Sequence, residues 1–234
     1  MRQDLMLRKS RRVDMINIAV DGPAGAGKST IARKVAADLG YVYVDTGAMF
    51  RAIGLYMVRS GVDLDDASQI AANVDGADID IEYIDGAQCV ILNGENVNGL
   101  IRTGEISDAA SKVAVVPDVR KKMLILQRNI ASNHDVIMDG RDIGSAVLPD
   151  ADLKIYLTAS VEVRAERRYK ENIEKGMKAD LAEIQQDIRE RDERDMTRSE
   201  APLQKVSDAI EIDSSYMTID EVVKKIEELA GDLK

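Results

Sequence analysis

Gly22-Pro23-Ala24-Gly25-Ala26-Gly27-Lys28-Ser29 is the stretch that decides the fold, because it fits the phosphate-binding pattern G-x-x-x-x-G-K-[ST]. The short apolar run 16–20 precedes this stretch, and residues 28–39 place apolar side chains at helical spacing. A strand, a tight loop and a helix in this order are the context that the pattern requires. The sequence therefore predicts an ATP site over residues 22–29 and the adjoining Thr30.

Each part of this loop has a physical role. Its glycines permit backbone conformations that turn successive N–H groups toward phosphate oxygens. The helix that begins near Lys28 directs the positive end of its dipole to the same place. Lys28 can add charge to the transferring phosphoryl group, and the Ser29 hydroxyl suits direct coordination of the Mg²⁺ that accompanies ATP.

Composition narrows the class of protein. The chain has 234 residues, enough for one α/β domain with a small insertion, and no apolar run that approaches a membrane span. Its net charge of −10 argues against nucleic acid as a partner, because a nucleic-acid binder needs a basic face. Cys89 is the only cysteine and His134 the only histidine, which excludes a disulfide framework within the chain and favours a reducing, cytoplasmic location.

Short apolar runs alternate with helical patterns along most of the chain. Such alternation predicts a P-loop-type parallel sheet with helices on both faces. The expected strands are residues 41–44, 136–138, 153–157 and 209–212, and the expected helices are residues 47–60, 117–132, 160–175, 180–198 and 218–230.

Residues 73–111 differ from the rest of the chain in their pattern of polar and apolar side chains. Residues 78–84 alternate acidic and apolar side chains, Asp85-Gly86 is a hairpin signal, and residues 88–92 suit a partner strand. We expect a small antiparallel β insertion here. The core is then 15–72 and 112–232, with an arginine-rich lid at about 160–198, and 1–14 is expected to be a disordered extension.

A phosphate-binding loop alone does not define a kinase, because GTPases and motors share it. The chain has no guanine-reading N-K-x-D pattern, and three clusters point to a second, anionic substrate. The first is residues 45–51, directly after the strand 41–44, where open α/β sheets place ligand-binding loops. Arg51 would face the cleft from there. The alternative is that Arg51 is a solvated arginine on a helix surface.

The second cluster is Asp139-Gly140-Arg141-Asp142, directly after the apolar strand 136–138. Asp139 can hold Mg²⁺ through water, as an acidic residue at this strand end does in related nucleotide-binding sites. The following turn offers a guanidinium fork for phosphate beside a carboxylate acceptor. The alternative is a turn closed by an ion pair between Arg141 and Asp142.

The third cluster is a pair of arginine-rich helices. Arg164, Arg167 and Arg168 share one helix face, and Arg191, Asp195 and Arg198 share another. Interleaved acidic residues leave open an ordinary salt-bridged surface. Beside a phosphate-binding loop, these helices suit a lid that closes arginines over ATP and excludes water.

The segments DGPAGAGKST, DTGAMFR, the β insertion, DGRDIG and RERDERDMTR occur in the order in which they occur in bacterial cytidylate (CMP) kinases, which the chain resembles over about residues 15–230. The resemblance implies a monomeric nucleoside monophosphate kinase that uses ATP with Mg²⁺ to phosphorylate CMP or dCMP. It also implies that the insertion at residues 73–111 binds the monophosphate. Phe50 departs from the tyrosine that this family more often has, and Thr46 from its serine. Other acceptors, such as UMP, AMP or shikimate, and a nucleotide-dependent regulator remain alternatives.

The resemblance also implies roles for individual residues. The acceptor phosphate would be held by Thr46, Arg51 and Arg141. The ribose side would be met by Arg191 and Asp195, with Arg198 nearby. The cytosine edge would be read by Ser111, Arg120 and Asp142. The lid would supply Arg164 and Arg168, which together with Lys28 and Arg141 would form the catalytic set.

Overall fold

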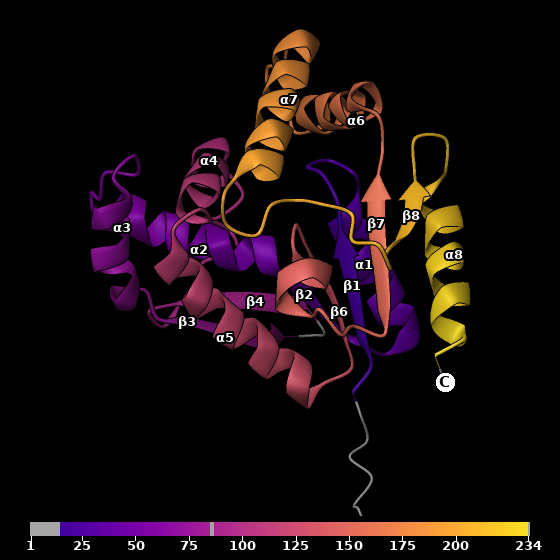
Figure 1. Ribbon diagram of the computed structural model, residues 1–234. Helices are drawn as coiled ribbons and strands as arrows, with labels where there is room; N and C mark the ends of the chain where they lie inside the picture. The colour runs from indigo at the N-terminus through magenta and orange to yellow at the C-terminus, as the bar shows by residue number, and fades with distance from the viewer. Residues whose placement is uncertain (1–14, 85–86, 234) are drawn as a thin grey trace, which may run out of the picture.

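Five parallel strands form the central sheet within residues 15–84 and 87–233, which the computed structural model describes (Figure 1). Their order is β2-β6-β1-β7-β8, so β1 lies at the centre and β2 at one edge. The strands are β1 (Asn17–Asp21), β2 (Val42–Asp45), β6 (Val136–Gly140), β7 (Leu153–Thr158) and β8 (Ile210–Asp213). The predicted parallel sheet is confirmed, with strand ends that differ from the prediction by one or two residues.

Helices cover both faces of this sheet, as predicted. Ile18, Val20 and Ile137 point into one core with α1 (Lys28–Leu39) and α8 (Ile219–Gly231). Their neighbours Ala19 and Met138 point into the other core, on the side of α2 (Thr46–Arg59) and α5 (Pro117–Asn133). Alternate strand residues thus face opposite cores, because side chains alternate along a strand. No helix in the described part of the chain is long and apolar enough to cross a membrane.

The segment predicted as an insertion contains a second, antiparallel sheet. Its strands are β3 (Ile79–Ile84), β4 (Ala87–Leu92) and β5 (Glu95–Asn96); the predicted turn at Asp85-Gly86 lies outside the described residues, as does the extension 1–14. Two helices beside this sheet were not predicted. α3 (Ala67–Asn73), followed by the 3₁₀ turn η1 (Val74–Gly76), precedes it, and α4 (Gly104–Val113) follows it. The second sheet shares the core of α2, so it does not carry a core of its own.

Two helices stand beyond the carboxyl ends of the parallel strands. These are α6 (Val161–Glu174) and α7 (Leu181–Thr197), seen at the top of Figure 1, where the sequence predicts the lid. A short π-helix, η2 (Ile143–Val147), follows β6 on the same side of the sheet. The carboxyl ends of β1, β2 and β6 therefore open toward α6 and α7, which is where open α/β sheets bind their ligands.

Truncation of Met138 tests the packing of the sheet against α2 and α5. Its side chain is 0% exposed, so Met138→Ala leaves a cavity. We expect the free energy of unfolding to fall by ~2–5 kcal/mol, measured by urea unfolding. Ile125→Ala on α5 is the control, because Ile125 is 66% exposed and its truncation should change the free energy by less than ~0.5 kcal/mol. Equal losses in both variants would contradict the core position of Met138.

Candidate active site

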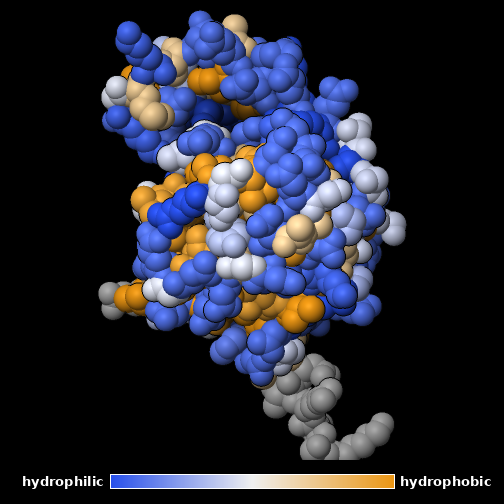
Figure 2. All heavy atoms as spheres, turned by 90° about the vertical axis from the view of Figure 1, so that its left-hand side faces the viewer, coloured by the Kyte–Doolittle hydropathy of each residue, from blue (hydrophilic) through white to orange (hydrophobic). Residues whose placement is uncertain are grey.

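A cavity of about 720 Å³ lies at the carboxyl ends of β1, β2 and β6. Figure 2 shows a hollow between the upper lobe, formed by α6 and α7, and the body of the molecule. The cavity brings together most of the residues that the sequence predicts for both substrates. Those that line it are Ala24, Gly25, Gly27, Lys28, Ser29, Thr30, Thr46, Arg51, Ser111, Asp139, Arg141, Asp142, Arg164, Arg168, Arg191, Asp195 and Arg198.

The phosphate-binding loop depends on glycine at two close approaches. Gly22 has a φ of 148°, and a Cβ there would lie 1.9 Å from the carbonyl oxygen of Leu157. Gly25 has a φ of 77° and lies against the Arg164 side chain. A side chain at either position would be strained, because L residues rarely adopt positive φ. The loop is thus held against β7 and α6 before any nucleotide binds.

Lys28 lies folded under the loop. Its ammonium group donates hydrogen bonds of 2.7 Å to Gly22 O and 2.8 Å to Pro23 O, and the residue is only 6% exposed. Burial lowers the pKa of Lys28, and the nearby positive charge of Arg141 lowers it further. An anion entering the cavity would favour the charged ammonium form, because opposite charge stabilises it.

Ser29 and Asp139 lie together where a metal ion would meet the nucleotide phosphates. The Ser29 hydroxyl donates to Asp139 Oδ2 over 2.6 Å, and the Tyr43 hydroxyl donates to Asp139 Oδ1 over 3.2 Å. Burial raises the pKa of Asp139, and the Asp45 carboxylate raises it further. Hydroxyl and carboxylate oxygens are ligands that Mg²⁺ accepts. The pair therefore fits Mg²⁺, and the described residues contain no group of three or more His, Cys, Asp or Glu side chains that could hold a metal ion.

Several arginines line the end of the cavity that lies away from the phosphate-binding loop. Arg51 donates to Asp45 over 3.1 Å, but the Nε atoms of Arg51 and Arg191 are buried without a hydrogen-bond partner among the described residues. Burial and, to a smaller extent, the positive charge of Arg141 lower the pKa of Arg191 to about 10. Buried guanidinium groups that repel one another are stabilised by an anion placed between them. This end of the cavity is therefore suited to a phosphate.

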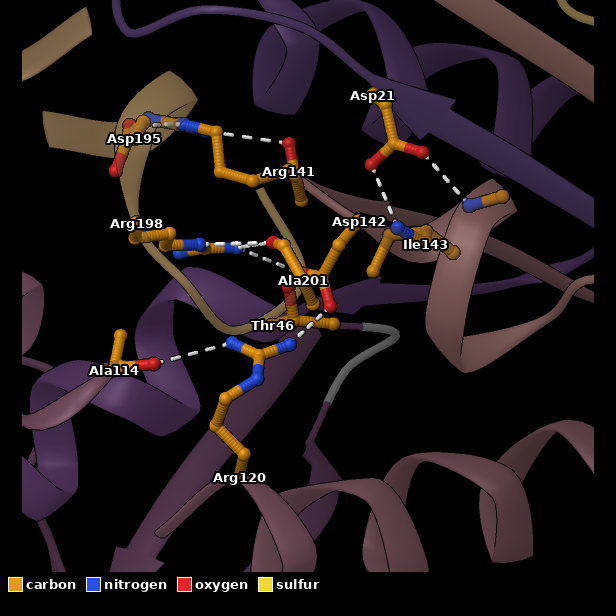
Figure 3. Close-up of polar contacts among 12 residues, drawn as sticks. Asp21, Thr46, Ala114, Arg120, Arg141, Asp142, Ile143, Asp195, Arg198 and Ala201 are labelled. Carbon is orange, nitrogen blue, oxygen red and sulfur yellow. Dashed lines mark hydrogen bonds and ion pairs between the residues drawn. The ribbon is translucent and has the colours of Figure 1, made fainter. Parts of the chain in front are cut away.

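Asp142 and Arg141 each bind a residue from a distant segment (Figure 3). The Asp142 carboxylate accepts a hydrogen bond of 3.1 Å from Arg198 and also pairs with Arg120. Arg141 donates to Asp195 over 2.8 Å. The alternative, a turn closed by an ion pair between Arg141 and Asp142, is therefore wrong. Both contacts tie the turn after β6 to α7 and to the segment that follows it.

Six of the predicted residues lie at the margin of the cavity or outside it. The Thr46 hydroxyl donates to Asp139 O over 2.7 Å, and Thr46 is 3% exposed. Ser111 lies on α4 and donates to Ser107 O over 3.4 Å. Arg120 lines a smaller neighbouring cavity of about 260 Å³. The backbone of Gly22, Pro23 and Ala26 completes the loop without lining the main cavity.

The three arginines of α6 that the sequence assigns to a lid differ in their surroundings. Arg164 is 4% exposed, donates to Ala24 O and Ala159 O over 2.9 Å each, and pairs with Asp192 of α7 over 2.7 Å. It joins α6 to the phosphate-binding loop and to α7. Arg167 donates to Ser214, whereas Arg168 is exposed and lines the cavity. Of these three side chains, Arg168 is thus the most available to a ligand.

Asp21 is a site residue that the sequence analysis missed. Its carboxylate accepts hydrogen bonds from Ile143 N over 2.8 Å and Gly144 N over 2.7 Å, so it connects the end of β1 to η2 (Figure 3). Burial raises the pKa of Asp21 to about 6. Its position at a strand end, directly before the loop, is the signal that could have identified it.

The geometry suits the transfer of a group between two phosphate-bearing molecules. One end of the cavity offers a nucleotide phosphate loop, and the other offers arginines with unsatisfied donors. Fold and site together therefore place the chain among the P-loop phosphotransferases, or kinases.

Comparison with known proteins narrows this class. The family model described as cytidylate kinase matches residues 18–232. The cytidylate kinases of Caldicellulosiruptor saccharolyticus and Lactobacillus gasseri are each 50% identical to this chain, over 92% of it and over 95% and 94% of their own lengths. The chain belongs to the cytidylate kinase family, and it is a nucleoside monophosphate kinase.

A solved structure supports the fold alone. An uncharacterized protein from Eubacterium ventriosum superposes with a TM-score of 0.52 at 12% identity, over 93% of this chain and 99% of that one. Such a likeness, at this identity, describes the arrangement of strands and helices and carries no information about substrate.

The pKa of Asp21 predicts a pH dependence. The pKa of about 6 in the folded protein lies above the ordinary aspartate value of 3.8, so the stability that this group contributes is complete below about pH 4 and is lost as pH rises through 6. The difference in unfolding free energy between wild type and Asp21→Asn should therefore fall by on the order of 3 kcal/mol from about pH 4 to about pH 7. Chemical denaturation across this range measures it.

The exposed Asp150 provides the control for this titration, since Asp150→Asn removes a carboxyl group of the same kind from the surface. As a surface substitution, it should change the unfolding free energy by less than ~0.5 kcal/mol. A difference for Asp21→Asn that does not change with pH would contradict the raised pKa of Asp21.

Proposed function

We propose that this enzyme transfers the γ-phosphoryl group of ATP to CMP, and also to dCMP, by in-line displacement with release of ADP. The observation that carries the proposal is a single cavity that joins the loop at residues 22–30 to the arginines around Asp142. Family membership supports CMP as the acceptor. The extension to dCMP and the roles of individual residues are part of the proposal.

In this mechanism the protein positions two phosphate groups and neutralises their charge. Lys28 exchanges its hydrogen bonds to Gly22 O and Pro23 O for oxygens of the transferring group. Arg141 and Arg168 bring positive charge from the other side. Ser29 would hold Mg²⁺ directly and Asp139 would hold it through water, and the ion would neutralise charge on the nucleotide phosphates. A general base is unnecessary because the acceptor atom is already a phosphate oxygen.

Arg164 has a different role in this proposal from that of Arg168. Its bonds to Ala24 O and Asp192 already occupy the guanidinium group, so it supports the loop while the lid closes. Arg168 has an exposed side chain at the cavity and is the arginine that moves onto the ATP phosphates.

The acceptor is recognised in three parts. Arg51 and Arg141 hold its phosphate, with Thr46 completing this end of the site. The ribose lies against Arg191, Asp195 and Arg198. The cytosine edge faces Ser111, Arg120 and Asp142. The pairing of Asp142 with both arginines supports this assignment, because it holds the carboxylate in place and leaves little freedom for its direction.

We further propose that the enzyme acts as a monomer in the cytoplasm. Donor and acceptor sites both come from one chain, and the free thiol of Cys89 suits a reducing compartment. Sedimentation at working concentration measures the oligomeric state.

The rival candidates within enzymes are kinases of other small acceptors. Release of ADP, measured by a coupled assay across CMP, dCMP, UMP, AMP and shikimate, separates them. Fast release with CMP and dCMP alone supports the proposal. A nucleotide-dependent regulator would release no ADP in response to any acceptor.

Lys28→Met removes the ammonium group while keeping most of the side-chain volume. We expect turnover to fall by about 10³-fold or more, because a principal charge on the transition state is lost. Turnover with CMP, measured together with the thermal unfolding temperature, checks this. Lys34→Met is the control, because Lys34 lies exposed on the same helix and pairs with Asp220. Near-normal turnover of folded Lys28→Met would reject the role of Lys28.

Asp142→Ala tests recognition of the base. The loss of a buried carboxylate leaves Arg120 and Arg198 without their partner, so the KM for CMP should rise by roughly ten- to a hundredfold, equivalent to roughly 1–3 kcal/mol. The KM for ATP should change much less. Steady-state kinetics with each substrate varied in turn measures both values. Asp150→Ala on the exposed surface is the control. Equal weakening of both nucleotides would show that Asp142 does not read the base.

A further inference from the structure

The outer edge of β2 is held by side chains of the second sheet. β2 is an edge strand that pairs only with β6 among the described strands, so its backbone groups on the other side need different partners. The hydroxyl of Tyr83 donates to Tyr43 O over 3.1 Å. Gln88 Oε1 accepts from Asp45 N over 2.7 Å, and Gln88 Nε2 donates to Asp45 O over 3.3 Å.

Gln88 therefore acts as a neighbouring strand would, since one side chain satisfies both backbone groups of Asp45. Tyr83 and Gln88 lie directly opposite each other on β3 and β4, and cross-strand partners of this kind share one face of a sheet. Asn98 holds the backbone around Gln88 in turn. It donates to Gln88 O over 2.9 Å and accepts from Val90 N over 3.0 Å.

Asp45 connects Gln88 to Arg51, at the end of the cavity proposed for the acceptor. Its carboxylate caps α2 by accepting from Ala48 N over 2.8 Å, and it pairs with Arg51 over 3.1 Å. Asp45 is 5% exposed, so its carboxylate has little space to turn. A shift of its backbone would move the carboxylate and the guanidinium group that depends on it.

We propose that Gln88 is a positioning residue for acceptor binding. By fixing both backbone groups of Asp45, it orients the carboxylate that directs Arg51 into the cavity. The second sheet thus contributes to acceptor recognition through one amide side chain, and Gln88 touches neither substrate. This inference rests on the proposed function, in which Arg51 holds the acceptor phosphate.

Gln88→Leu removes both hydrogen bonds to Asp45 and keeps a similar side-chain volume. We expect the KM for CMP to rise about tenfold, the loss of one to two net hydrogen bonds, while kcat falls less than ~3-fold. The KM for ATP should stay within ~2-fold of wild type, because the donor end is not connected to Gln88. Steady-state kinetics with each substrate varied separately measures this split.

Glu82→Leu is the matched control. Glu82 is exposed on β3 and lies opposite Cys89, so it occupies the other face of the hairpin. The same replacement there should leave the KM for CMP unchanged. A purely structural role for Gln88 would instead lower the unfolding temperature and the activity with both substrates together.

A double-mutant cycle tests whether Gln88 acts through Arg51. In an Arg51→Ala background, Gln88→Leu should change the KM for CMP by less than ~2-fold, because two residues in one chain of contacts are not additive. A full tenfold rise in that background, or no rise in the single variant, would overturn the inference. Absence of CMP-dependent ADP release in the wild type would instead reject the proposed function on which it rests.

Discussion

Asp139, at the end of β6, is the residue through which the two halves of the cavity are connected. Its carboxylate accepts from Ser29 of the phosphate-binding loop and from Tyr43 of β2, and its backbone oxygen accepts from Thr46 at the start of α2. One residue thus sets the donor loop and the first turn of the acceptor helix relative to each other. In a reaction that depends on holding two phosphates in line, this spacing is the main contribution that a protein can make.

A second constraint is the balance of buried charge around that point. Arg141 binds Asp195, Asp142 binds Arg198, and Arg164 binds Asp192. The first two pairs join the turn after β6 to α7 and to the segment that follows α7. The third pair joins α6 to α7. Removal of one partner from a buried pair is costly because the other charge is left without compensation. Helices α6 and α7 are therefore linked to the turn after β6 by residues most of which line the cavity.

The second sheet is not an independent attachment. Its apolar face completes the core on the α2 side, and its polar edge reaches β2 through Tyr83 and Gln88. If Gln88 positions Asp45 as proposed, acceptor recognition would depend on hydrogen bonds between a side chain and a backbone segment about 40 residues away in sequence.

The residues at 22–29 and the alternating apolar runs were sufficient to predict the parallel sheet, the covering helices and the donor loop, because these features follow from local spacing and from glycine. Local spacing did not predict α4, because residues 104–113 were assigned to the β insertion. It also missed Asp21, Tyr43 and Gln88, since a single carboxylate, phenol or amide carries no periodic signal. The partners of Arg141 and Arg164 were decided only by the tertiary structure, because several carboxylates along the chain could satisfy either guanidinium group and only packing chooses among them.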